Sequence, residues 1–582
     1  MKIIDIFEFE EKDGIEVELL GVETKDSISV YTLNFKWNEE NAKNDDTIDI
    51  IWRVPMLDLL YRWTPNCFVD RSLPPEYFYK YNHSMVSYNA PVTVLFNGKS
   101  EHKYSWALSE TTKLVYYRTG VRENNGTVTT SVKIPLRQYT NCYETTIKVR
   151  IDNGTKGFTE AIGEIAKWWE KDLNSPVLSV PESAKDALYS FWYSYHRDFT
   201  AESIEDECRK AAELGFKTVI VDDGWQTPNI WWEGYRICGD WKVAANKIPD
   251  MKAHVEAVHK MGLKYVLWYS VPFMGDKSSV YPEFEGMMLR KFDENTGLLD
   301  PRYKKVRDFL IGVYKKALIE WDLDGLKLDF IDRWCDDEEN APYDEGMDIP
   351  ALQDAVDALM TEIANELKSI KPDVLIEFRQ NYIGPNMRKF GNMFRVTDCP
   401  DDYIRNRIGV LDLRLMMENS AVHSDMLMWH NDESAEIVAI QIISILFGVM
   451  QYSAKIGEQS DDIIKTSRFW IDFMAEHKDL LLNSNLEVFE PHLLYTWAKA
   501  SNKDECAVAV YSVDKCIKPD KKDTVYIANG SEEKRIIAQM EDDYSAEIFN
   551  CLGQTVQKGI KIQKGINIFE IPVGGLAILK KN

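Results

Sequence analysis

The chain has 582 residues, of which 45% are hydrophobic and 28% charged, and its formal net charge is −25. This composition excludes a disordered, fibrous or collagenous protein, because it supplies a large apolar core with modest glycine and proline. The negative charge argues against nucleic acid and against an anionic membrane surface as partners, since both would repel the chain. At about 150 residues per domain, the length predicts three or four units, or two small ones around a large barrel.

The first part of the chain, residues 1–183, has the pattern of an antiparallel β-sandwich. Residues 28–36, 92–96, 127–134 and 144–151 are rich in β-branched and aromatic side chains, and Asn-Gly turn sequences separate them. Strands at this spacing favour a large sandwich. A helical pattern over residues 159–172 leads out of it.

The pattern changes near Ala184, where helices begin to alternate with short apolar runs. We expect helices over residues 201–214, 251–261, 304–320 and 349–371, and strands over residues 217–222, 264–270, 325–330, 374–378 and 393–397. This alternation requires parallel strands with crossover helices. It favours a (β/α)8 TIM barrel over residues 184–484, with an open sheet as the alternative.

The last part, residues 485–582, returns to strands and predicts a small C-terminal β-sandwich. Its expected strands are residues 506–512, 524–528, 545–549 and 566–571, divided by Gly, Asn and Asp. The predicted fold is therefore multidomain, with a central barrel between two β domains.

The cysteines and the N-terminal segment indicate the cellular compartment in which the protein is expected. Nine cysteines are scattered without a CxxC pair, which is typical of free thiols in a reducing environment. The first residues, MKIIDIFEFEEKDG, become acidic too early for a secretory signal. The most apolar long stretch, residues 437–450, is interrupted by Gln441 and Ser444 and predicts a buried helix rather than a membrane span. We therefore expect a soluble cytoplasmic protein.

Acidic residues follow several predicted barrel strands, at the end where TIM-barrel active sites lie. Asp329 is the sharpest case, because it lies in an apolar run and shares a strand face with Lys327. A buried carboxylate beside a cation stays ionised, as a nucleophile must. The alternative is a structural ion pair inside the barrel.

Asp398 follows the strand at residues 393–397. To act as a general acid it needs a raised pKa, the opposite of what the nucleophile needs. A general acid holds its proton near neutral pH, and burial and like-charge neighbours promote this. Asp401 and Asp402 are close enough in sequence to have this effect, or they could begin the next helix. One ionised and one protonated carboxylate are what glycoside hydrolysis requires.

Other side chains at the expected mouth suit sugar binding. Asp222 and Asp223 are adjacent, and paired carboxylates accept charge-assisted hydrogen bonds from vicinal hydroxyls. Trp225, Trp241 and Trp268 could form walls for the apolar faces of a sugar, with core packing as the alternative.

Motifs for other chemistries are missing from the sequence, including HExxH, GxxxxGK[ST], GxGxxG and GxSxG. His423, Asp425 and His430 come closest to a metal-ligand cluster, but their spacing is weak and we expect no metal there.

Together these residues resemble the α-galactosidases of glycoside hydrolase family 36, in the clan shared with family 27. The similarity runs from about Ser190 to Asp425. The matching pieces are Phe191-Trp192-Tyr193 with Asp198-Phe199-Thr200 (first barrel strand and the start of its helix), Val221-Asp222-Asp223-Gly224-Trp225 ("DDGW"), Gly239-Asp240-Trp241, Lys327-Leu328-Asp329 ("KWD") and Thr397-Asp398-Cys399-Pro400-Asp401 ("SDNTD").

The resemblance implies a retaining exo-α-glycosidase, foremost an α-galactosidase, with Asp329 as nucleophile and Asp398 as acid/base. It implies a barrel between β domains and no metal or organic cofactor. The expected partner is a small oligosaccharide or glycoside, and a homo-oligomer is possible. The expected substrate-binding residues are Asp222, Asp223, Trp241, Trp268, Lys327, Arg379 and Arg395.

Three segments depart from the family pattern. They are Tyr269-Ser270-Val271-Pro272 in place of "EPE", Phe330-Ile331-Asp332-Arg333-Trp334 in place of "MNR", and Glu377-Phe378-Arg379-Gln380-Asn381 in place of "ESCSGGG". Arg379 replaces a Cys on the C2 side of the sugar and could reshape the pocket or bind an acidic substituent. The alternatives are an α-glycosidase for another sugar such as N-acetylgalactosamine, a transglycosylase, and a non-catalytic sugar-binding protein.

Overall fold

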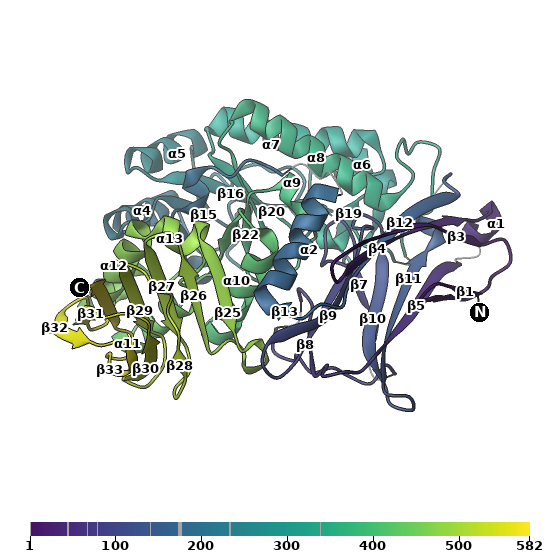
Figure 1. Ribbon diagram of the computed structural model, residues 1–582. Helices are drawn as coiled ribbons and strands as arrows, with labels where there is room; N and C mark the ends of the chain where they lie inside the picture. Colours follow the sequence, from purple (N-terminus) through teal and green to yellow (C-terminus); the bar gives the residue numbers. More distant parts are fainter. Residues whose placement is uncertain are drawn as a thin grey trace.

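The computed structural model describes residues 2–43, 46–66, 68–77, 80–139, 141–172, 177–231, 234–337 and 339–582. The barrel occupies the upper part of Figure 1, with the N-terminal sheets at the right and the C-terminal pair of sheets at the lower left. The predicted multidomain TIM-barrel fold with flanking sandwiches is confirmed. The boundaries at residues 183/184 and 484/485 stay predictions. In the described part of the chain no helix is both long and apolar enough to span a membrane.

The N-terminal strands form two antiparallel sheets packed face to face. One sheet has the order β1-β2-β5-β11-β10-β7 and the other β3-β4-β12-β9-β8-β6, with β13 paired to β9. Alternate side chains such as Ile48, Ile50 and Trp52 on β5 enter the shared core, as the two-residue period of a strand requires. The elements are β1 Lys2–Ile4, β2 Phe7–Phe9, β3 Glu16–Lys25, β4 Ile28–Lys36, α1 Glu39–Lys43, β5 Thr47–Pro55, β6 Tyr61–Trp63, β7 Asn82–Ser84, β8 Val92–Phe96, β9 Glu101–Leu108, β10 Val115–Arg122, β11 Thr127–Pro135, β12 Glu144–Asp152 and β13 Lys156–Gly157.

The barrel sheet is parallel, with eight strands among the described residues in the order β23-β22-β21-β20-β16-β15-β14-β24. Between β23 and β24, the two ends of this order, His423 forms a single β-bridge with Val449. The strands are apolar runs because helices cover their outer face and side chains fill the inside. They are β14 Leu188–Ser190, β15 Thr218–Val221, β16 Lys264–Ser270, β20 Gly325–Asp329, β21 Leu375–Arg379, β22 Met393–Arg395, β23 Ala421–His423 and β24 Gln451–Tyr452.

Helices surround this sheet, and several begin with a side-chain cap predicted by simple helix chemistry. Thr200, Asp250, Asp402, Ser434 and Ser460 each accept the backbone N–H three residues on. The helices are α2 Phe158–Asp172, α3 Trp192–Tyr195, α4 Ala201–Leu214, α5 Met251–Lys260, α6 Tyr281–Phe284, α7 Lys304–Trp321, α8 Leu352–Ile370, α9 Met387–Phe390, α10 Tyr403–Met417, α11 Ala435–Ser444, α12 Asp461–Glu476 and α13 Lys478–Asn483. A small antiparallel sheet after β16 joins β17 Phe273–Gly275, β18 Met288–Lys291 and β19 Thr296–Leu299.

Two expectations about local structure were wrong. The segment 437–450 is helical only to Ser444, where α11 ends, because the chain must then return to the barrel as β24. The first barrel strand is Leu188–Ser190 rather than the segment beginning at Phe191, and Trp192–Tyr195 is a helical turn above it.

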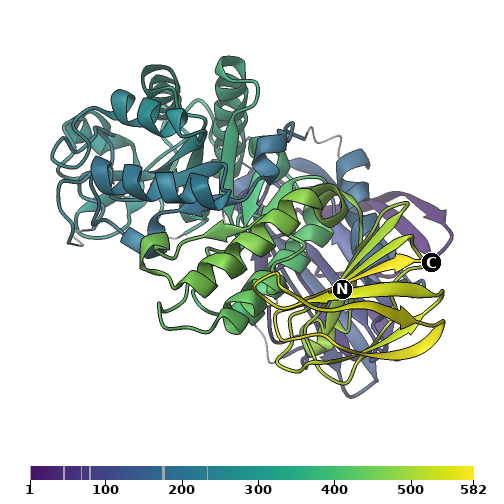
Figure 2. The same cartoon turned by 90° about the vertical axis from the view of Figure 1, so that its left-hand side faces the viewer.

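The C-terminal strands form a second sandwich, at the lower left of Figure 1 and at the lower right of Figure 2. Its sheets have the orders β25-β26-β27-β29-β34-β31-β32 and β28-β30-β33. The pairs β27–β29 and β28–β30 are parallel and the others antiparallel. The strands are β25 Asn485–Phe489, β26 Trp497–Ser501, β27 Glu505–Val510, β28 Cys516–Ile517, β29 Thr524–Asn529, β30 Arg535–Met540, β31 Tyr544–Phe549, β32 Thr555–Ile562, β33 Gly565–Glu570 and β34 Leu576–Lys581.

Asp412 on α10 joins the three units. Its buried carboxylate accepts hydrogen bonds from Trp63 Nε1 and Arg71 Nη2, each at 2.9 Å, and from the Tyr495 hydroxyl. Trp63 and Arg71 precede the barrel and Tyr495 follows it, so one carboxylate links segments more than 400 residues apart.

Replacing Asp412 with alanine is therefore expected to destabilise the protein by about 3–5 kcal/mol, because Arg71 keeps a buried charge without its carboxylate. Thermal and urea unfolding measure the change. Arg535→Ala, which breaks an exposed pair with Asp514, is the matched control and should change stability by less than about 1 kcal/mol. Equal effects of the two variants would contradict the role of Asp412.

Candidate active site

The predicted site residues come from neighbouring strand ends of the barrel. Asp329 is the last residue of β20, and in the parallel register it lies beside Ser270 of β16. Lys327 lies between Trp268 of β16 and Glu377 of β21. Asp222 and Asp223 follow β15, and Asp398 follows β22. The carboxyl ends of parallel strands share one edge, so the barrel gathers these residues at one mouth.

Asp329 is buried and held by donors from three strand ends. Its Oδ2 accepts the indole N–H of Trp268 at 3.1 Å. Its Oδ1 accepts from Arg379 Nε at 2.9 Å, from the Tyr382 hydroxyl at 2.9 Å and from the Phe330 amide at 2.8 Å. This network fixes the carboxylate in one orientation.

Phe330, which follows Asp329, takes an unusual backbone conformation. Its φ of +65° lies in the left-handed region, which costs a bulky residue about 1–3 kcal/mol. Its amide N–H donates to Asp329 Oδ1.

The environment keeps Asp329 ionised. Burial acts to raise its pKa, but the charges of Arg379 and Lys327 and the hydrogen bonds outweigh it and hold the pKa well below its usual range. The sequence predicted an ionised carboxylate with Lys327 as its cation. The stronger partner is Arg379, whereas Lys327 Nζ forms a 2.5 Å ion pair with Asp222.

Arg379→Gln is expected to move the acid limb of the kcat/KM–pH profile upward by about one pH unit or more. Without the guanidinium, the pKa of Asp329 rises, so protonation removes the nucleophile at a higher pH than in the wild type. A pH profile on an activated α-galactoside measures this. Arg209→Gln, which removes an exposed arginine on α4, is the control and should leave the limb in place. An unmoved limb in Arg379→Gln would contradict the assignment.

The adjacent residues Asp222 and Asp223, predicted to bind sugar hydroxyls, have different partners in the structure. Asp222 pairs with Lys327, as described above. Asp223 is buried and accepts from Arg197 at 2.5 and 3.0 Å and from Gln226 Nε2 at 2.7 Å. The carboxylate of Asp223 is therefore already bound by protein groups. It holds the side chains of Arg197 and Gln226 in place.

Asp398 is half-exposed, with 49% of its side chain accessible, and its Oδ1 accepts from Arg395 Nη2 at 2.7 Å. Burial acts to raise its pKa, but Arg395, Arg379 and Lys327 lower it below its usual value. The expected raised pKa was therefore wrong. Asp402 caps α10 and Asp401 accepts from Gln441, and the charges that dominate at Asp398 are instead those of Arg395, Arg379 and Lys327.

Arg395 is the centre of a buried charge network rather than an open sugar contact. Its guanidinium also pairs with Asp425 and approaches Glu377 at 3.9 Å. Asp425 in turn accepts from the Tyr193 hydroxyl at 3.0 Å and from the Cys399 amide at 2.6 Å. These contacts fix the strand end that carries Asp398.

The tryptophans form a buried cluster behind the carboxylates. Trp225, Trp241 and Trp268 are all at most 5% exposed, and their rings lie 6.0–6.2 Å apart in the pairs with Trp241. Packing therefore accounts for Trp225 and Trp241. Trp268 has in addition a direct contact with the site, through its indole N–H on Asp329.

Sequence reasoning missed Tyr382 and Arg197, and it named Tyr193 only as part of a matching segment without a role in the site. Tyr382 and Arg197 lie in loops after β21 and β14, and no periodicity marks them. Only their position in the sequence could have indicated them, because residues that follow a barrel strand lie at the end of the barrel that holds the active site.

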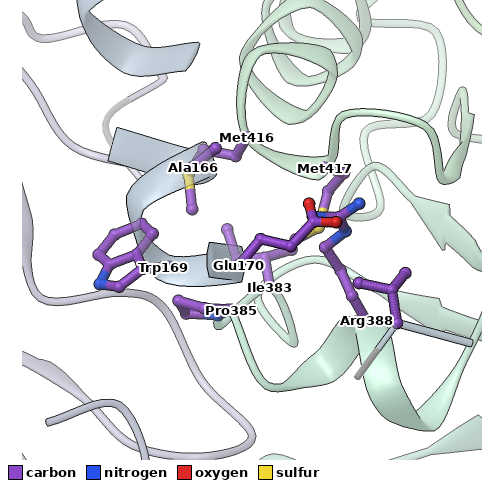
Figure 3. Close-up of a pocket in the computed structure, with 9 residues that line it drawn as sticks. Ala166, Trp169, Glu170, Ile383, Pro385, Arg388, Met416 and Met417 are labelled. Carbon is purple, nitrogen blue, oxygen red and sulfur yellow. The ribbon is translucent and has the colours of Figure 1, made fainter. Parts of the chain in front are cut away.

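A cavity of about 20 Å³ lies between α2 and the segment around α9 and α10, where Glu170 and Arg388 pair at 3.0 Å (Figure 3). That volume holds about one water, far less than a sugar. Within the described residues, no group of three or more His, Cys, Asp or Glu side chains is placed to hold a metal ion.

The fold and the strand-end acids define a barrel protein of the glycoside hydrolase class. Residues 148–483, more than half of the chain, match the Melibiase family, and the chain belongs to that family. The resemblance found in the sequence is confirmed at this level.

The chain is similar to two curated proteins. These are alpha-galactosidase Mel36A of Lactobacillus acidophilus, 28% identical over 213 residues, and alpha-galactosidase AgaA of Geobacillus stearothermophilus, 26% identical over 196 residues. The matched stretches cover 34% and 30% of this chain, and 27% and 25% of those proteins. The match thus spans only about a quarter of the length of these relatives.

Solved structures share the fold over nearly the whole chain. The structure of the GH36 alpha-galactosidase AgaA of Geobacillus stearothermophilus in complex with raffinose aligns with a TM-score of 0.66 at 15% identity, covering 98% of this chain and 82% of that one. The galactosidase domain of the alpha-galactosidase-sucrose kinase AgaSK gives the same TM-score and identity, over 98% and 80%. At this identity the likeness is one of fold.

Proposed function

We propose that the protein is a retaining exo-α-glycosidase that hydrolyses terminal α-galactosides. The observation that carries the proposal is the state of Asp329, a buried carboxylate that is kept ionised and oriented by Trp268, Arg379 and Tyr382 at the mouth of the barrel. Such a group suits attack on a carbon centre. The names of the relatives support galactose as the sugar.

In the first step, Asp329 attacks the anomeric carbon while the bond to the leaving oxygen breaks, and Asp398 gives that oxygen a proton. In the second step, Asp398 takes a proton from water, which attacks the anomeric carbon and releases Asp329. Two inversions retain the anomeric configuration. Asp222 and Lys327 would bind sugar hydroxyls, with Arg379 beside the nucleophile.

The experiment that tests this follows the first-formed anomer by NMR during hydrolysis of 4-nitrophenyl α-galactoside. Retention gives α-galactose before mutarotation, whereas inversion gives the β-anomer and would contradict the mechanism. The matching N-acetylgalactosaminide, glucoside and arabinoside define the sugar. Hydrolysis of none of the four, with galactose still bound, would favour the sugar-binding alternative.

A further inference from the structure

The three segments in which the sequence departs from the family pattern meet beside the nucleophile. Phe273 begins β17 after the first departure, Phe330 follows Asp329, and Arg379 ends β21. The rings of Phe273 and Phe330 stack with centroids 4.7 Å apart, and the Arg379 guanidinium lies 5.6 Å from the Phe330 ring. Phe330 and Arg379, from two of the departing segments, therefore lie together with Phe273, the residue that directly follows the third.

Aromatic rings continue from this point to the surface. Tyr235 lies 4.6 Å from Phe273 and 5.5 Å from Phe330. Phe292, in the turn between β18 and β19, lies 4.5 Å from Phe273 and is 36% exposed. We call Tyr235, Phe273, Phe292 and Phe330 the aromatic shelf. Phe273 is its buried base, and the other three rings are partly accessible.

The shelf is connected to the catalytic carboxylate at its inner end. The Phe330 amide binds Asp329, and Tyr235 stacks against Trp268, which also binds Asp329. A group attached to the sugar and leaving from the mouth would meet these rings. Two cations lie over the rings, because Arg333 is 5.4 Å from Phe292 and Arg379 covers Phe330.

The rings of the shelf can pack against a flat apolar group. The strand end that carries Phe273 reads Tyr-Ser-Val-Pro, with no carboxylate or amide to hold hydroxyl groups. Aromatic rings bind other rings through stacking and edge contacts. We propose that the aromatic shelf is an aglycone subsite that binds an aryl or benzyl aglycone of the α-galactoside. This inference rests on the proposed function.

The test compares benzyl and methyl α-galactoside with α-galactosyl fluoride, which has no aglycone. We expect the wild type to prefer the benzyl over the methyl substrate. Phe292→Ala should lower the ratio of kcat/KM for the benzyl substrate to that for the fluoride by roughly three- to tenfold. Tyr143→Ala, which removes an exposed aromatic ring from the N-terminal sandwich, is the control and should leave the ratio unchanged.

The outcomes separate the two proposals. Failure of the wild type to hydrolyse the fluoride would contradict the proposed function. Hydrolysis of the fluoride, with an unchanged ratio in Phe292→Ala and in the gentler Phe292→Leu, would overturn the aglycone subsite alone. Equal loss on all three substrates would also overturn it, because the ring would then act through the structure of the site.

Discussion

Asp329→Ala is expected to lower kcat on 4-nitrophenyl α-galactoside by at least about a thousandfold, because no covalent intermediate can form. Added azide should restore turnover by entering the vacated space, and the product should be β-galactosyl azide. NMR identifies the product anomer. Recovery of α-galactosyl azide, or near-normal activity without azide, would contradict the assignment of the nucleophile.

The fold should survive this change. Arg379 loses its partner, but its side chain is 19% exposed and water can solvate it in part. Circular dichroism should therefore stay close to the wild type, and the melting temperature should fall less than in Asp412→Ala, whose arginine partner is fully buried. Asp308→Ala, which removes an exposed carboxylate paired with Lys304 on α7, is the matched control and should keep full activity.

Much of the architecture could be predicted because local pattern and tertiary packing agree. The strands 28–36, 92–96 and 264–270 and the helix 201–214 were predicted at their observed bounds. Long periodic segments between turn residues leave little choice of structure. The first barrel strand was misplaced because it has only three residues, too few for a period to show.

The candidate site was predictable in position but not in its pairings. Strand order brings Asp329 and Asp398 to one edge, and strand order follows from the repeated βα pattern. The partner of each carboxylate depends on side chains that arrive from other strand ends. Arg379 lies 50 residues from Asp329, and no local pattern indicated that its guanidinium, rather than Lys327, would contact the carboxylate.

The ion pair between Asp398 and Arg395 has a consequence for pH dependence. Because the pKa of Asp398 is lowered, the free protein carries this group ionised above an acidic pH. A general acid must instead be protonated, and kcat/KM reports the free enzyme. We therefore expect kcat/KM to fall on the alkaline side of an acidic optimum. Arg395 holds only Oδ1 in the described structure, so Oδ2 is the oxygen that we expect to carry the proton.

Asp398→Ala is expected to separate substrates by their leaving groups. Benzyl α-galactoside, whose alkoxide leaves only with a proton, should lose about a hundred- to ten-thousandfold in kcat/KM, whereas 2,4-dinitrophenyl α-galactoside should lose far less. The alkaline limb of the pH profile should disappear, because the group that titrates there is gone. Azide should intercept the covalent intermediate and give α-galactosyl azide, the anomer opposite to that from Asp329→Ala. Equal losses on both substrates would show instead that Asp398 only positions Arg395 and the strand end that carries it.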